Sequence, residues 1–292
     1  MARGAVEIWY ATWGDAQAAY LVDLIRRPAE SVARVAVFRR GQAARVLRQV
    51  FARDALVASD GGSGATLGSW RLDREGCAGR IDDRAGDLVQ DLALDCQYRL
   101  HGPEVTMVPS WVGMLSPSVP ALRSTPGTVI AATASSGSVP CVFTRYRVGD
   151  IARARWFLIS AQAFEGVEPG PDVRCEISGG WFGGRWALTG YLRLGDELVP
   201  LNHPMANLRR FRAPAVGDEV GATRRFEVTY QSRRISLRLT AEAPADGFVV
   251  LEREGATTIH TTLFGSCALD LTVAGAGRRL VARDRCLLEV KG

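Results

Sequence analysis

Several side chains that could polarise a bound molecule lie close in sequence to tryptophans. Glu176 is the strongest candidate among these polar side chains, because it precedes a cluster around Trp181 on an expected strand. A carboxylic acid that lines an apolar cavity has its pKa raised by desolvation and can serve as a general acid. The alternative is a solvated acid at a strand edge. Asn202 and His203 follow a strand end at Pro200-Leu201 and lie in a loop, where sites are common. Other polar residues near the aromatic side chains are Glu7, Thr12, Asp15, Gln162 and Glu165.

The aromatic residues are unevenly distributed and suggest two explanations. They gather at the start of the chain, in its middle and early in its second half, as Trp9, Tyr10, Trp13, Trp111, Trp156, Trp181, Trp186 and Tyr191, with Met107 near Trp111. Tryptophan and tyrosine are major contributors to protein cores. A β-barrel whose mouth collects aromatic side chains, methionine and a few polar groups is also a common form of apolar ligand cavity. Both explanations stay open at this point.

Motifs for the commonest catalytic chemistries are absent. No G-x-S-x-G, Walker loop or strand-flanked G-x-G-x-x-G is present, which disfavours a serine nucleophile elbow and the usual nucleotide sites. The six cysteines are widely spaced and form no zinc-ligand pattern, so they are interpreted as small buried side chains. The three histidines, His101, His203 and His260, are far apart in sequence. We therefore expect no metal site.

Charge and hydropathy exclude further classes. The formal net charge is +5, and Lys291 is the only lysine among 36 basic residues. The arginines are dispersed in expected turns and strand ends rather than gathered in a stripe with stacking aromatics, which argues against nucleic-acid binding. No run of eighteen apolar residues and no secretory signal is visible, so we expect a cytoplasmic protein without a membrane span.

The expected elements that position these residues are mostly strands. The chain has 292 residues, of which 47% are hydrophobic, enough for one large or two ordinary domains. Two-residue alternation is clear over 91–100, in a hairpin over 226–241, and over 259–273 with a last strand at 280–290. Short strands with Gly-rich turns between them predict an all-β sandwich or barrel. Helical periodicity is credible only over 43–51 and over 16–27, where alternation also fits a strand.

A proline-rich stretch divides the chain. Residues 103–140 contain six prolines, and we interpret them as a long connection that packs onto the protein through Met107 and Trp111. The expected domains are therefore 1–140, which includes this connection, and 141–292. Two β halves of similar size are also compatible with a diverged duplication.

Short motifs along most of the chain resemble those of the two-domain lipocalin-like family. They are Glu7 to Trp13, Phe51, Gly79-Arg80-Ile81 with Asp91-Leu92-Ala93-Leu94, Gly190-Tyr191-Leu192, Ile259-His260-Thr261-Thr262 and the closing strand Ala282 to Glu289. That family includes carotenoid 1,2-hydratases, tocopherol-cyclase-like proteins and the Diels-Alderases of polyketide biosynthesis. Where the family has an Asp-His-x-Trp-Gly-like segment, this chain has Asn202-His203-Pro204-Met205, so only His203 matches and hydratase chemistry is less expected.

The resemblance implies two consecutive lipocalin-like (calycin) β-barrel domains with few short helices and chemistry without a cofactor. Its functional implication is a cyclase or isomerase, with a Diels-Alderase-type pericyclase as one form, acting on a hydrophobic polyketide or isoprenoid of natural-product biosynthesis. The aromatic residues and Met107 would shape the pocket, and Glu176, Asn202 or His203 would polarise the substrate. The alternative is a carrier that binds a lipid-like ligand without turnover. The expected partner is a hydrophobic small molecule, and the expected state is a monomer or homodimer.

Overall fold

The structure is a computed structural model. It describes residues 6–15, 17–85, 88–101, 104–106, 121–132, 139–148, 155–162, 164–165, 173–182, 185–201, 210–254 and 257–292. The contacts between residues divide the chain into two compact units, Met1–Ala152 (unit 1) and Arg153–Gly292 (unit 2). Each unit has a hydrophobic core of its own.

Every described element longer than three residues is a β-strand, which confirms the all-β prediction. Unit 1 contains β1 (Val6–Gly14), β2 (Ala18–Arg26), β3 (Glu30–Arg39), β4 (Arg45–Ala52), η1 (Arg53–Ala55), β5 (Leu56–Ala58), η2 (Asp60–Gly62), β6 (Gly64–Leu67), β7 (Trp70–Asp73), β8 (Gly76–Ala85), β9 (Leu88–Leu100), β10 (Val105–Thr106), β11 (Ala121–Ala132) and β12 (Pro140–Val148). Unit 2 contains β13 (Trp156–Ala161), β14 (Val173–Phe182), β15 (Arg185–Leu194), β16 (Glu197–Pro200), β17 (Phe211–Val220), β18 (Thr223–Gln231), β19 (Ile235–Pro244), η4 (Ala245–Gly247), β20 (Val249–Glu254), β21 (Thr257–Val273) and β22 (Ala276–Lys291).

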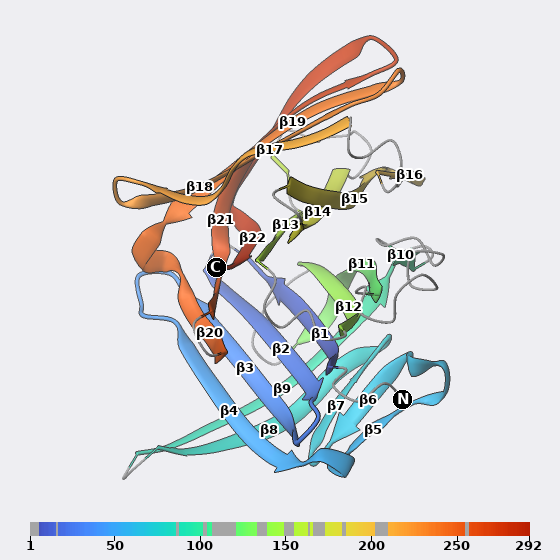
Figure 1. The fold of residues 1–292 in the computed structure, drawn as a ribbon. Helices are drawn as coiled ribbons and strands as arrows, with labels where there is room; N and C mark the ends of the chain where they lie inside the picture. The colour runs from blue at the N-terminus through green and yellow to red at the C-terminus, as the bar shows by residue number, and fades with distance from the viewer. Residues whose placement is uncertain are drawn as a thin grey trace. The chain divides into compact units, whose positions relative to one another are not determined.

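Unit 1 is built on one antiparallel sheet with the strand order β4-β3-β2-β1-β12-β11-β9-β8-β7-β6-β5, and β10 pairs with β11 (Figure 1). The sheet curls, so that β3 contacts β6 and β4 contacts β8. Side chains alternate between the two faces of each strand. Trp9, Ala11 and Trp13 of β1 point into the enclosed core. In both units we call the face of the sheet that points into the unit's own core the core face, and the opposite face the second face.

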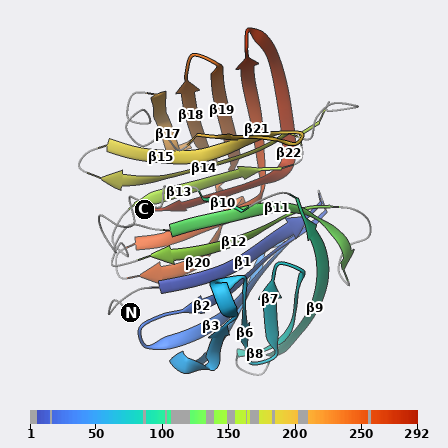
Figure 2. The same ribbon diagram turned by 90° about the vertical axis from the view of Figure 1, so that its right-hand side faces the viewer.

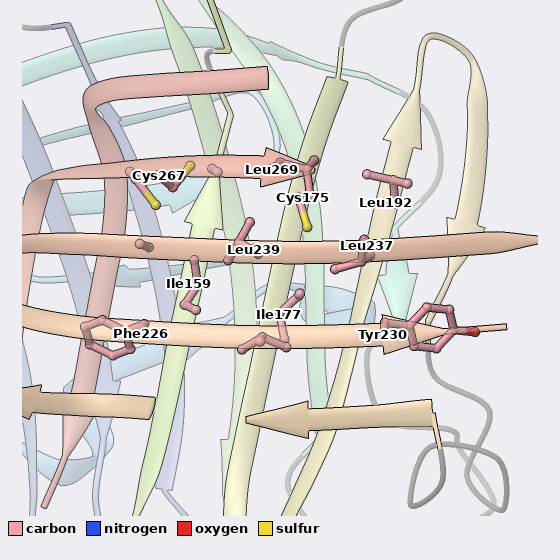
Figure 3. Close-up of a cluster of buried hydrophobic side chains, with 14 of the residues drawn as sticks. Ile159, Cys175, Ile177, Leu192, Phe226, Tyr230, Leu237, Leu239, Cys267 and Leu269 are labelled. Atoms are coloured by element: carbon pink, nitrogen blue, oxygen red, sulfur yellow. The ribbon is translucent and has the colours of Figure 1, made fainter. Parts of the chain in front are cut away.

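Unit 2 has a second antiparallel sheet, with the strand order β16-β15-β14-β13-β22-β21-β19-β18-β17 and β20 paired with β21 (Figure 2). Its core face carries aliphatic and aromatic side chains from distant strands, and Figure 3 shows Ile159, Ile177, Leu237, Leu239 and Phe226 among them. The alternation predicted for 226–241 places Phe226, Leu237 and Leu239 on the core face, as the hairpin β18–β19 requires.

The two units share one topology. In each, the first strand pairs with the last, β1 with β12 and β13 with β22. The next three strands continue on one side of that pair, and the strands before the last one continue on the other, with β11-β9-β8 matching β21-β19-β18. By their place in these strand orders, β1, β2 and β3 correspond to β13, β14 and β15.

The proline-rich stretch is not simply a connection. Its described part contains β11, which pairs with both β9 and β12, and the β-branched residues Thr125, Thr128, Val129 and Ile130 account for its strand character. Strand β12 pairs with β1 and so belongs to the first sheet. The boundary between the two units therefore lies between residues 152 and 153, whereas the sequence analysis expected it between residues 140 and 141.

The two helical candidates are strands. Residues 18–26 form β2, which is buried on both faces, so apolar residues fill nearly every position and fit either period. Asp15 Oδ1 accepts from the backbone N–H groups of Gln17 (2.7 Å) and Ala18 (2.9 Å) and shapes the β1–β2 turn, not a helix start. Residues 45–52 form β4, which pairs with β3. There the neighbouring pairs Val46/Leu47 and Val50/Phe51 imitate a helical stripe, but the members of each pair point to opposite faces.

Candidate functional site

The alternation of β14 and β15 separates the candidate residues of unit 2 into two groups. Trp181 and Trp186 are register partners on the core face. Glu176 and Tyr191 are register partners too, but they lie on the second face. Successive side chains of a strand point to opposite faces, so two residues share a face only when their sequence numbers differ by an even number. The structure therefore corrects the expected grouping of Glu176 with the Trp181 cluster.

Glu176 and Tyr191 form a buried carboxyl–phenol pair. The Tyr191 hydroxyl donates to Glu176 Oε2 at 3.2 Å. Glu176 is 1% exposed and Tyr191 is fully buried. Ser160 of β13, also buried, is the register neighbour of Glu176. Three adjacent strands thus contribute one polar side chain each, and we call them the Ser160–Glu176–Tyr191 row.

Gln162 extends this row beyond the end of β13. Its Nε2 donates to Ser160 Oγ at 2.9 Å. Its Oε1 is buried and has no hydrogen-bond partner among the residues that the structure describes. A buried acceptor without a donor costs free energy, so this oxygen is a favourable place for a donor from water or a ligand.

Apolar side chains flank the row on the same face. Leu158 and Leu287 are both buried, and Leu287 is the register partner of Ser160. Further along, Thr261 Oγ1 donates to Glu289 Oε2 at 2.5 Å. Arg174 and Lys291 are buried on this face as well. The surroundings combine apolar surface with a few placed polar groups, which is the usual composition of a small-molecule site.

Trp181 and Trp186 of unit 2 form an aromatic ladder with Phe157 on the core face. The rings of Trp181 and Trp186 meet edge to face with centroids 5.2 Å apart, and Trp186 meets Phe157 in the same way at 5.2 Å. Trp181 is 37% exposed and Phe157 is fully buried, so the ladder leads from the surface into the core. Trp156 is half-buried on the second face, where Lys291 is its register partner.

Trp9 and Trp13 belong to the core of unit 1. The Trp9 Nε1–H donates to the Gly62 carbonyl at 3.2 Å, and the Arg145 guanidinium lies over the Trp9 ring at 5.7 Å. Trp13 stacks on Tyr20, with centroids 5.4 Å apart. These contacts favour the core-packing explanation for both tryptophans.

Tyr10 points to the second face of unit 1, away from Trp9 and Trp13. Its register partner is Asp23 of β2, and Asp23 in turn faces Arg34 of β3. The sequence analysis missed Asp23 and Arg34. A signal was present, because each is a single charge inside an otherwise apolar run, Tyr20 to Ile25 and Val32 to Phe38.

Four of the predicted site residues cannot be placed. Met107, Trp111, Asn202 and His203 lie outside the described residues. Their expected roles therefore stay predictions.

The cysteines are buried and have no disulfide. Desolvation by burial raises the pKa of Cys96 to about 12 and raises the pKa of Cys77, Cys175 and Cys286 as well. The reactive form of cysteine is the thiolate, so these four thiols are poor nucleophiles at neutral pH. No three His, Cys, Asp or Glu side chains within the described ranges are grouped as metal ligands.

The described residues include no helix with the length and hydropathy needed to span a membrane.

Solved structures with this architecture cover nearly the whole chain. A protein of Nitrosomonas europaea provisionally named AttH has a TM-score of 0.58 at 15% identity and covers 98% of this chain and 92% of its own. CghA with Sch210972 has a TM-score of 0.60 at 12% identity, with 99% and 88% covered. Kievitone hydratase from Nectria haematococca has a TM-score of 0.53 at 10% identity, with 97% and 88% covered.

The fold is lipocalin-like. At these identities the similarity concerns the architecture of the whole chain and not its chemistry. No protein-family model matches the sequence, and no curated protein matches it.

Proposed function

We propose that this chain is a cofactor-independent cyclase or isomerase that acts on a hydrophobic polyketide or isoprenoid, with a Diels-Alderase-type pericyclase as one form. The observation that carries the proposal is the buried Glu176–Tyr191 pair on the second face of unit 2. A carboxyl group among buried leucines can donate or accept a proton at one fixed position, away from bulk water. An isomerisation consumes no co-reactant, which agrees with this small set of polar groups.

In this proposal Glu176 forms a hydrogen bond to a carbonyl group of the substrate, and the Tyr191 hydroxyl fixes the carboxyl group in place. Polarisation of that carbonyl lowers the barrier most when the donor is already oriented. Apolar surface on the same face, including Leu158 and Leu287, would hold the rest of the substrate folded with its reacting ends close together. Asn202 and His203 remain further candidates for polarisation, and Met107 and Trp111 for contact with the substrate.

Two of the similar structures support a small-molecule role. CghA was solved with Sch210972, and kievitone hydratase is a hydratase by name. Both have the lipocalin-like architecture over almost all of this chain. A carrier without turnover would use the same apolar surface, so the experiment has to separate binding from conversion.

The test compares Glu176→Gln and Tyr191→Phe with the control Tyr230→Phe, which removes a buried phenol from the core face of the same unit. Linear polyene carbonyl compounds serve as substrates, because cyclisation consumes conjugated double bonds and lowers the absorbance. We expect Glu176→Gln to lower turnover by about 10²–10⁴-fold while binding, measured by tryptophan quenching, is kept. Tyr230→Phe should keep turnover. Binding without turnover in the wild-type protein would favour the carrier instead.

A further inference from the structure

One end of the unit 2 sheet carries charged side chains on its core face. Arg224 of β18 lies two residues before Phe226, a member of the unit 2 core, and therefore points to the same face. His260 of β21 is the register partner of Val290, which also belongs to that core. A Cβ atom on Gly217 of β17 would lie 3.1 Å from Val290 Cγ2. The end of the β17–β18 hairpin therefore approaches the part of the sheet that carries His260.

Arg224 keeps one buried donor without an acceptor. Its Nη2 donates to Glu219 Oε1 at 2.8 Å, and its guanidinium group lies over the Phe248 ring at 5.2 Å. Its Nε is buried and has no hydrogen-bond partner among the described residues. An unpaired buried donor of a charged group costs free energy, so this nitrogen is a favourable place for an oxygen atom of a ligand. The side chain as a whole is 16% exposed, which leaves its guanidinium group within reach from solvent.

Positive charge exceeds negative charge around His260. Partial burial is the main cause that lowers the pKa of His260; the charges of Arg224 and Arg253 lower it further, and Glu219 acts in the opposite direction. Arg253 of β20 is exposed and forms no ion pair within the described parts of the chain. On β22 the neighbour of His260 is the apolar Val290. Two arginines thus accompany one glutamate here, and a bound anion would relieve the repulsion between the cationic groups.

Apolar side chains lie beside these charges. Val250 is the register partner of His260 on β20 and is 37% exposed. Val220 ends β17 and is 63% exposed. A backbone hydrogen bond of 2.8 Å joins η4, which precedes β20, to the β17–β18 turn. Exposed apolar surface next to cationic groups fits an anion that carries an apolar chain better than it fits an inorganic ion.

We propose that Arg224, Arg253 and His260 form a binding site for the carboxylate group of an apolar acid. The Nε and Nη2 atoms of Arg224 form the planar fork that matches two carboxylate oxygens. Glu219 is 58% exposed, so an incoming carboxylate can replace it on Nη2. Arg253 adds a second positive charge, and a neutral imidazole at His260 can donate one N–H.

The proposed carboxylate site is separate from the Ser160–Glu176–Tyr191 row. Arg224 and His260 lie on the core face of the unit 2 sheet, whereas the row lies on its second face. The inference therefore does not depend on the proposed function.

Nuclear magnetic resonance of the histidine rings tests the site, because the chain has only three histidines. The variant His260→Gln assigns the His260 signal, and His101 of unit 1 is the internal reference. The probes are octanoate, acetate, which has the same carboxylate without the chain, and octanamide, which has the chain without the charge. We expect octanoate to move the His260 signal saturably and to bind about tenfold more tightly than acetate. It should also raise the pKa of His260, since a bound anion favours the protonated imidazole.

Arg253→Gln and Arg225→Gln are a matched pair of variants. Both replace an exposed arginine of unit 2 by the same amide, but Arg225 points to the other face of β18 from Arg224. Arg253→Gln should weaken octanoate binding about threefold to fivefold, and Arg225→Gln should leave it unchanged. Arg224→Gln should weaken it about tenfold or more, because hydrogen bonds from a charged group are lost.

Equal octanoate binding by Arg253→Gln and Arg225→Gln would overturn the site. Should Arg224→Gln fail to fold, this pair still decides, because both positions are exposed. Binding of octanamide as tight as that of octanoate would overturn a carboxylate site, and binding of acetate as tight as that of octanoate would overturn an apolar acid as the ligand. Each of these outcomes leaves the test of Glu176 unaffected.

Discussion

Single residues in this protein take their roles from the face of the strand on which they lie. Tyr10 is adjacent in sequence to Trp9, yet one points to the second face and the other into the core. Glu176 and Tyr191 are likewise separated from Trp181 and Trp186. The composition of a short segment therefore does not identify a site here, because half of its side chains belong to another environment.

His260 should make stability depend on pH. Partial burial is the main cause that lowers its pKa below 6.5, with further contributions from the charges of Arg224 and Arg253 and an opposing one from Glu219. The folded protein then binds this proton less readily than the unfolded chain does. The contribution of neutral His260 to the free energy of unfolding is therefore fully present above about pH 6.5 and is lost as the pH falls below that value. We expect His260→Gln to lose less of its melting temperature between pH 7.5 and pH 5.5 than the wild type. Equal losses in both proteins would contradict this.

Strands and turns carry most of the local information in the sequence. The hairpin β21–β22 closes through Ala274 and Gly275, between the register partners Val273 and Ala276. Both turn residues have positive φ, +49° for Ala274 and +88° for Gly275. A two-residue turn of this kind matches the twist of the strands and favours Asn-Gly. Alanine at the first position of this turn is therefore less favourable than asparagine would be.

Ala274→Asn should stabilise the protein by about 0.5–1 kcal/mol, because asparagine tolerates the left-handed conformation better than alanine. Ala274 is exposed, so the substitution removes no packing. Chemical denaturation measures the gain. Ala276→Asn, at an exposed position of the adjoining strand, is the comparison and should bring no gain. If both substitutions had the same effect, the turn would not be the cause.

The whole molecule consists of two units with separate cores and one shared topology. The shared topology places Asp23 of unit 1 and Glu176 of unit 2 on the second strand of each unit, and both carboxyl groups are buried. Solved structures with TM-scores of 0.58 and 0.60 match 98% and 99% of this chain, so its architecture also occurs with very different sequences.

Substitutions in the two cores should act on different parts of the chain. Leu24 and Leu239 are fully buried in units 1 and 2, and replacement of either by alanine should cost about 2–5 kcal/mol. We expect Leu24→Ala to speed amide hydrogen exchange in peptides from residues 6–148, and Leu239→Ala in peptides from residues 156–291. Mass spectrometry of the exchanged peptides reads this out. Equal acceleration in both halves by either variant would mean that the units unfold together.

The sequence alone determined the all-β class, the hairpins at 226–241 and 259–290 and the burial of the cysteines. Alternation and turn residues are local signals, and they are strong wherever one face of a strand is buried and the other is not. Prediction from the alternation failed at three strands. Burial on both faces hides the alternation in β2, adjacent apolar residues hide it in β4, and prolines hide it in β11.

Only the tertiary structure decided which side chains meet. The sequence singled out Glu176, Tyr191 and Tyr10, but the pairing of Glu176 with Tyr191, and the alignment of Tyr10 with Asp23 and Arg34, follow from strand register. Register joins positions that lie far apart in the chain, and a slip of one residue would turn each of these side chains to the other face. No local pattern could contain that information.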